Sequence, residues 1–141
     1  MKVILQDNNN YILRFDKGET VFQGLADFMS SQQISACNFS GIGSCSNVEL
    51  GFYNPFLKEY KKKPYIDEME IISLTGNGSI LDSDKKPTIH AHGIFGRIDF
   101  TVLGGHVFEI VVLATCEIFL TKLNGTMTRK NNPELNLNLL D

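Results

Sequence analysis

The sequence lacks tryptophan and is poor in cysteine, with three cysteines among 141 residues. Cys37, Cys45 and Cys116 are odd in number and form no Cys-x-x-Cys pair. Neither a disulfide framework nor a cysteine zinc cage is therefore expected, and the side chains are interpreted as buried free thiols. A nucleophilic Cys116 would need a base, and only the three histidines of the chain could serve.

The sequence also lacks an excess of positive charge and a long apolar run. Its net charge of -3 argues against a surface that binds phosphate throughout, because non-specific nucleic-acid affinity needs excess Lys and Arg, although a local basic patch stays open. The longest apolar run, Ile110 to Cys116, is far shorter than a membrane span, and Met1 to Asn10 lacks the apolar core of a signal peptide. We expect a soluble, cytoplasmic protein without a membrane partner.

The length and the 43% of hydrophobic residues fit one domain, residues 1–141, with a sizeable core. The tail from Met127 to Asp141 contains leucines at alternating positions and is expected to pack on the domain or on a neighbouring subunit. Arg129 and Lys130, within this tail, are interpreted as a solvated charge pair.

One segment has helical spacing. Its apolar residues recur on one face from Val21 to Met29, and Thr20 with Gln23 three residues later matches a capping box. This pattern predicts a long helix from about Thr20 to Gln33. Its apolar face is expected to pack into the hydrophobic core and to carry no chemistry.

Alternating and β-branched segments predict strands in the rest of the chain. Ile34 to Ser40 is one, closed by Gly41 to Ser44, which we assign to a turn because GIGS lacks both the GxGxxG spacing and the lysine of a phosphate-binding loop. The lysines from Lys58 to Lys63, interleaved with tyrosines, favour a lysine-protected edge strand over a stacking surface for single-stranded nucleic acid. Most connections are short, so we expect an α+β fold: a mostly antiparallel sheet with the one long helix packed on it.

All three histidines lie in one segment, Thr88 to Val107. If Thr88 to Phe95 is a strand, His90 and His92 point to the same face, and the apolar side chains between them fill the other. Gly104-Gly105 allows the backbone either to turn tightly or to approach another group closely, and a loop that returns through such a turn could bring His106 to them. The three side chains are candidate metal ligands with an open coordination position, and the alternative is that they satisfy local hydrogen bonds.

Charged residues stand in apolar surroundings near the histidines: Arg97, Glu109 and Glu117. A glutamate beside a metal-bound water could act as an acid or base, and Arg97 could hold a carboxylate substrate. The alternative is an Arg–Glu pair within the fold or between subunits. We retain Arg97 and Glu117 as candidates that support the metal ligands or contact a substrate.

Seven short motifs follow one another in a specific order and spacing. They are Gly18-Glu19, SGIGS at Ser40 to Ser44, VELGFYN at Val48 to Asn54, EIISLTG at Glu70 to Gly76, HAH at His90 to His92, GGH at Gly104 to His106 and TCEI at Thr115 to Ile118. Together they resemble a stand-alone PPC (plants and prokaryotes conserved) domain of the bacterial type over nearly the whole chain.

The resemblance implies an α+β fold with a mainly antiparallel sheet, assembled as a homotrimer. In plants, PPC domains follow AT-hook segments and are linked to trimerisation, protein contacts and transcriptional regulation, and bacterial members are commonly described as DNA-binding. This sequence has no Arg-Gly-Arg-Pro core that would insert into an A·T minor groove. The implied DNA binding therefore loses its best physical support here.

More distantly, the fold of the family resembles that of α-acetolactate decarboxylase, whose zinc is held by a His-x-His pair and a later histidine. His90, His92 and His106 follow the same order, so the resemblance implies zinc or another divalent transition metal as the cofactor. It fixes no role for Arg97 or Glu117, and a shared fold does not establish a shared activity.

Two functional hypotheses follow. The first is a non-enzymatic homotrimeric interaction or regulatory module, with a protein or DNA as partner and the histidines structural or metal-binding at subunit borders. The second is a small zinc-dependent enzyme, a lyase or hydrolase that acts on a small carboxylate bound at the histidines. We favour the first, because no complete catalytic set beyond the histidines can be named in the sequence.

Overall fold

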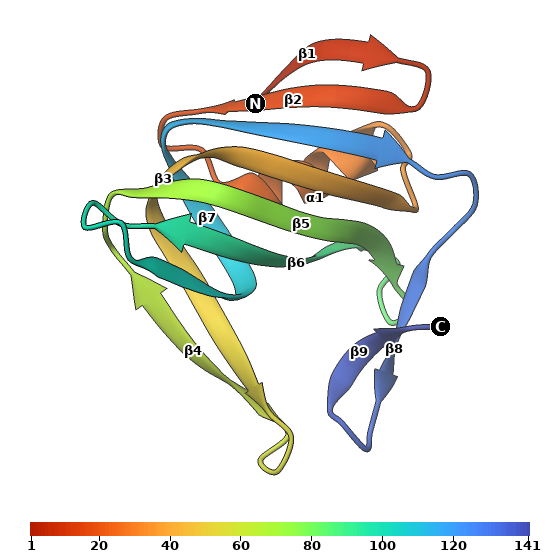
Figure 1. Cartoon of the computed structure of the whole chain (residues 1–141). Helices are drawn as coiled ribbons and strands as arrows, with labels where there is room; N and C mark the ends of the chain where they lie inside the picture. Colours follow the sequence, from red (N-terminus) through yellow and green to blue (C-terminus); the bar gives the residue numbers. More distant parts are fainter.

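Strands dominate the structure, a computed structural model that describes all residues from 1 to 141 (Figure 1). The elements are, in order, β1 (Lys2–Asp7), β2 (Asn10–Asp16), α1 (Val21–Ser31), β3 (Cys37–Asn54), β4 (Glu59–Tyr65), β5 (Met69–Leu81), β6 (Pro87–Gly96), β7 (Val102–Lys122), β8 (Thr128–Asn132) and β9 (Leu137–Leu140). All nine strands belong to one hydrogen-bonded sheet.

Four of the strands form a closed ring. β3 pairs with β5, β5 with β6, β6 with β7, and β7 returns to β3. The β1–β2 hairpin extends this ring from the second half of β7, while β4 pairs with the end of β3. These pairs are antiparallel, but β8 joins β5 in parallel at Ile80 and Leu81, so the sheet is mixed.

The predicted α+β fold with a long helix is wrong: the protein is mostly β, with 65% of its residues in strands and 8% in a helix. The helix has 11 residues instead of spanning Thr20 to Gln33. It ends in a Schellman-type motif, in which the Ile34 N–H donates to the Met29 carbonyl at 2.8 Å and Gln33 adopts a left-handed φ of 51°. Glycine usually occupies that position. Here it is Gln33, so no glycine marks the end of the helix in the sequence. No helix of the structure combines the length and apolar character needed to cross a membrane.

The start of α1 is capped from a distant strand. The Thr20 side chain makes no capping hydrogen bond, and the Gln23 side chain donates to Asp27 instead, so the predicted capping box is wrong. The carboxylate of Glu109, on β7, accepts hydrogen bonds from the backbone N–H groups of Phe22 at 2.8 Å and Gln23 at 3.2 Å. A carboxylate at this end also complements the helix dipole. This role accounts for a glutamate in an apolar strand.

The GIGS segment lies inside a long strand and not in a turn, contrary to the prediction. β3 runs through it without a break, with shifts of register toward β5 and β7 around Gly43. A Cβ atom on Gly43 would lie 2.3 Å from the Thr115 carbonyl oxygen, and its φ of 151° is one that glycine adopts readily. Glycine is needed here because the β3 and β7 backbones pass too closely for a side chain.

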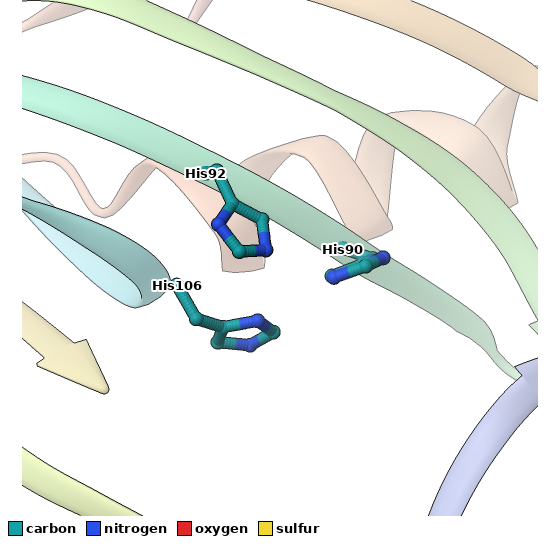
Figure 2. Close-up of side chains that lie close together, drawn as sticks. All are labelled: His90, His92 and His106. Atoms are coloured by element: carbon teal, nitrogen blue, oxygen red, sulfur yellow. The ribbon is translucent and has the colours of Figure 1, made fainter. Parts of the chain in front are cut away.

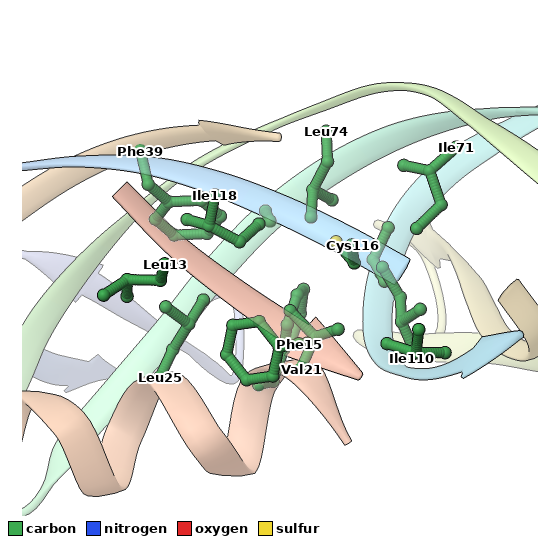
Figure 3. Packing of buried hydrophobic residues seen from close by; sticks show 14 of the residues in the cluster. Leu13, Phe15, Val21, Leu25, Phe39, Ile71, Leu74, Ile110, Cys116 and Ile118 are labelled. Atoms are coloured by element: carbon green, nitrogen blue, oxygen red, sulfur yellow. The ribbon is translucent and has the colours of Figure 1, made fainter. Parts of the chain in front are cut away.

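The core lies between the ring and α1, as Figure 3 shows for its central residues. Alternation along β2, β5 and β7 turns apolar side chains into this core, where each fully buried one contributes about 1.5–3 kcal/mol. The fully buried members drawn in Figure 3 include Leu13, Phe15, Val21, Leu25, Leu74, Ile110, Cys116 and Ile118.

The three cysteines belong to this core and are free, as predicted. Burial raises the pKa of the Cys37 thiol to about 11 and the pKa values of Cys45 and Cys116 to about 12. All three are therefore protonated thiols near neutral pH, and Cys116 has no nucleophilic character.

Candidate metal-binding site

Two of the histidines lie on β6 with their side chains on the face away from the core. Ala91 and Phe95, on the alternate face, are fully buried, which agrees with the predicted alternation. His106, on β7, is the direct cross-strand partner of His92 in the antiparallel β6–β7 pair. Figure 2 shows the three imidazole rings gathered in front of these two strands.

The connection that brings His106 to this face differs from the predicted one. The chain turns between Arg97 and Thr101, where the Arg97 N–H donates to the Thr101 carbonyl at 2.9 Å. Gly104 and Gly105 are inside β7 and not in a turn. A Cβ atom on Gly105 would lie 3.0 Å from the Gly51 carbonyl oxygen, so glycine here allows β7 to pass close to β3.

The geometry of the histidine cluster fits a transition-metal ion. Its ring centroids lie 5.0 to 5.4 Å apart, and one nitrogen from each ring lies within 4.8 Å of the others. Tetrahedral zinc with Zn–N bonds of about 2.0–2.1 Å needs nitrogens roughly 3.3 Å apart, a change that side-chain rotation can supply. No carboxylate belongs to the cluster, so three neutral nitrogen ligands would leave one coordination position open.

Local electrostatics keep two of these imidazoles neutral. Burial, followed by the neighbouring His90 and His92, lowers the pKa of His106 to about 4. Burial also lowers the pKa of His90, followed by the charge of Arg129. Neutral imidazole is the form that binds metals, so both side chains are ready ligands at neutral pH.

Arg129 belongs to this site although the sequence did not predict it. The prediction of a solvated Arg129–Lys130 pair is wrong for Arg129, which is 8% exposed, whereas Lys130 is exposed and pairs with Asp141. The Arg129 Nη2 atom lies 3.1 Å from His90 Nδ1. A guanidinium only donates hydrogen bonds, so His90 Nδ1 accepts. A single arginine in a polar tail carries no sequence signal of burial.

Three further acceptors hold the Arg129 guanidinium in place. Its Nε donates to Ser79 Oγ at 3.0 Å, its Nη1 to the Asn138 carbonyl at 3.0 Å and its Nη2 to Asn77 Oδ1 at 2.9 Å. Arg129 thereby connects β5 and the β8–β9 hairpin to the histidine strand. All of its partners are uncharged.

Tyr60, on β4, covers the other side of the cluster. Its hydroxyl lies 3.4 Å from His106 Nδ1, and its ring packs against the rings of His106 and Phe108. Burial raises the pKa of the Tyr60 hydroxyl. β4 pairs with β3 alone, as expected of an edge strand, and the Lys62 ammonium lies 3.6 Å from the centre of the Phe108 ring. Tyr60 is thus engaged within the fold and is not free to stack on bases.

A pocket of about 390 Å³ between two hairpins adjoins the site and is lined by His90, His106, Tyr60 and Arg129, whereas His92 is exposed beside it. The β3–β4 and β8–β9 hairpins project from the same side of the ring in Figure 1. The Tyr53 hydroxyl donates to the Leu135 carbonyl, and Asn136 Nδ2 donates to the Lys58 carbonyl at 3.2 Å. The pocket is therefore closed on two sides by hairpins and floored by β6 and β7.

Arg97 and Glu117, the other two candidate residues, do not line this pocket. Arg97 lies in the β6–β7 turn, where its Nε donates to Asp67 at 3.2 Å in a separate groove. Glu117 is exposed in the second half of β7, beside Ile42 and Ile72. The structure brings neither of them to the histidines.

Solved structures with the same fold include proteins close to this chain in length. A candidate DNA-binding protein from Bacteroides thetaiotaomicron is 29% identical, with a TM-score of 0.91, 97% of this chain covered and 94% of that one. A plant- and prokaryote-conserved (PPC) protein from Pyrococcus horikoshii is 32% identical, with a TM-score of 0.88 and coverages of 100% and 97%. A metal-containing protein from Archaeoglobus fulgidus is 34% identical, with a TM-score of 0.86 and coverages of 99% and 99%.

The more distant fold resemblance is confirmed as well. α-Acetolactate decarboxylase from Bacillus subtilis is 16% identical, with a TM-score of 0.57, and the match covers 88% of this chain and 57% of that one. At this identity the likeness concerns the fold alone.

The relation to one family rests on both sequence and structure. No protein of curated function matches the sequence significantly. Residues 5–124, however, match the Plants and Prokaryotes Conserved (PCC) domain, the domain called PPC above. Together with the likeness to the Pyrococcus horikoshii PPC protein over the whole chain, this match means that the protein belongs to the PPC domain family.

Proposed function

We propose that this PPC domain is a metal-binding module in which His90, His92 and His106 hold zinc or another divalent transition ion. The observation that carries the proposal is the convergence of three imidazole nitrogens to within 4.8 Å, with no carboxylate among them. The Archaeoglobus fulgidus relative, a metal-containing protein, supports it. The bound ion would act as a Lewis acid that accepts a small ligand at its open position.

Elemental analysis of the untagged protein tests the metal site. About one transition-metal ion per chain is expected, because three neutral nitrogen ligands are enough for a site with an open position. Protein that is isolated without metal and also takes up no added zinc would overturn the proposal.

The module is proposed to act as a homotrimer. Ile94 shares the strand face of His90 and His92 and is 46% exposed, and the adjoining β6–β7 turn presents Ile98 at 94% and Phe100 at 93% exposure. Side chains this apolar and this exposed, beside a further exposed Ile72, are typical of an association surface. The proposed metal sites would then adjoin the borders between subunits.

The double substitution Ile98→Ser and Phe100→Ser is expected to convert the trimer into monomers, because it removes the two most exposed apolar side chains of the turn. Sedimentation equilibrium of the variant and the parent protein measures this. Ile4→Ser, at a 55% exposed position on the distant β1 strand, is the matched control and should stay trimeric. A monomeric parent protein, or a double variant that stays trimeric, would contradict the assignment.

An interaction or regulatory role is the function we favour for this trimer, in the cytoplasm, where three free thiols are usual. The candidate DNA-binding relative makes DNA one partner class, and proteins are the other. Lys61, Lys62 and Lys63 on the β4 edge would supply the positive charge for phosphate contacts.

Metal-dependent catalysis on a small carboxylate is the second candidate function. It is favoured by the arrangement beside the histidines of a buried cation, Arg129, and a hydroxyl group, that of Tyr60, which could contact such a substrate. Turnover of a small hydroxy or oxo acid that stops when the metal is chelated would distinguish the enzyme from the interaction module.

A further inference from the structure

Arg129 is a buried cation without a counter-ion. No carboxylate lies within ion-pair distance of its guanidinium, and its four hydrogen-bond partners are neutral: Ser79, Asn77, His90 and the carbonyl of Asn138. A charge removed from water is costly unless an opposite charge compensates it.

The surrounding pocket does not compensate the charge of Arg129. Its lining includes Arg129 and no aspartate or glutamate. The Lys62 ammonium, which lies over Phe108, is paired with Glu49 at 3.6 Å and adds no net charge. A cavity of about 390 Å³ with one net sign of charge concentrates small ions of the opposite sign.

Metal binding would free a further donor of Arg129. A metal on His90 Nε2 needs the proton on Nδ1, which cannot then accept from the guanidinium, and a metal on Nδ1 displaces the guanidinium directly. By either route the Arg129 Nη2 loses the acceptor that His90 provides. An oxygen anion bound to the metal would replace that acceptor.

We propose that the pocket between the β3–β4 and β8–β9 hairpins binds a small carboxylate, with Arg129 as its charged contact and the Tyr60 hydroxyl as its polar contact. The carboxylate bridges Arg129 and the metal, so the inference rests on the proposed metal site for its second contact. A hydroxyl or carbonyl group next to the carboxylate would lie within reach of Tyr60. The ligand class is therefore a short 2-hydroxy or 2-oxo acid.

Lactate, with its uncharged analogue propane-1,2-diol, is the pair of probes that tests this. In protein loaded with Co²⁺, lactate should shift the visible absorption bands saturably, and the diol should not. In metal-free protein, lactate should still shift the ¹⁵N signal of the Arg129 Nε–H, and the diol should not. Lactate should bind the metal-free protein more weakly than the Co²⁺-loaded protein. Arg129→Gln should weaken lactate binding by about 10- to 100-fold at an unchanged metal content, because a charged hydrogen bond is lost.

Two conservative variants keep the test decisive if Arg129→Gln does not fold. Arg129→Lys retains the charge and should bind lactate within about 10-fold of the parent protein, and Tyr60→Phe should weaken binding about 3- to 10-fold. Equal binding of lactate and the diol, or unchanged lactate binding in both Arg129→Gln and Tyr60→Phe, would overturn the carboxylate site while leaving the metal site in place. Failure to take up Co²⁺ would instead overturn the metal site, and the metal-free titration would then decide the carboxylate site by itself.

Discussion

His92→Ala is expected to lower zinc affinity by at least about 100-fold, so that the purified variant contains little or no metal. The loss of even a supporting hydrogen bond to a metal ligand costs about 10- to 100-fold in affinity, and the loss of the ligand itself should cost more. His92 is the exposed member of the cluster, and its imidazole makes no hydrogen bond within the chain, so the substitution leaves the fold unchanged. Elemental analysis and a competition titration with a chromophoric chelator measure the effect.

Thr88→Ala is the matched control for this experiment. Thr88 lines the same pocket but offers no nitrogen ligand. Its variant should retain the metal content of the parent protein. If His92→Ala keeps near-stoichiometric metal with unchanged affinity, the three-histidine site is wrong.

Gly43→Ala is expected to lower the free energy of unfolding by about 4 kcal/mol, a large part of the total stability of an ordinary domain. The added Cβ would lie 2.3 Å from the Thr115 carbonyl oxygen and 2.6 Å from the Cys116 Cα. Both are backbone atoms of β7, so relief requires β3 and β7 to separate in the middle of the ring. Urea unfolding followed by circular dichroism gives the change.

Gly18→Ala separates this clash from the cost of backbone conformation. Gly18 has a φ of 83°, but no atom lies within 4 Å of the position that its Cβ would take. The expected loss there is about 1–2 kcal/mol, from the left-handed conformation alone. Equal losses at the two positions would show that close contact between β3 and β7 is not what requires glycine at Gly43.

The predicted strand around the histidines is confirmed. It could be predicted because alternation of side chains depends only on neighbouring residues. Alternation places His90 and His92 on one face of β6 and Ala91 on the other, whatever the rest of the fold does. The predicted fold class was wrong for the opposite reason, because the length of the helix depends on a conformation that the local sequence does not indicate. Helical spacing from Val21 to Met29 is real, but the end of α1 depends on a left-handed Gln33, which the residue type does not indicate.

The predicted turns at the glycine-rich segments are wrong for another reason. The GIGS segment and Gly104-Gly105 have the composition of turns, yet both lie inside strands. Their glycines serve contacts between strands that are distant in the sequence, such as Gly43 with Thr115 and Gly105 with Gly51. A single sequence does not distinguish a glycine that allows a turn from one that allows another backbone to approach.

The sequence by itself determined the family, the candidate metal ligands and the burial of the cysteines, because motif order, strand alternation and residue chemistry are properties of neighbouring residues. Only the tertiary structure decided the closed ring, the capping of α1 by Glu109 and the burial of Arg129 beside His90. Each of these joins residues 39 to 87 positions apart, or strands whose pairing depends on the whole sheet. The charge of the pocket, and with it the ligand class we propose, therefore follows from packing rather than from any local pattern.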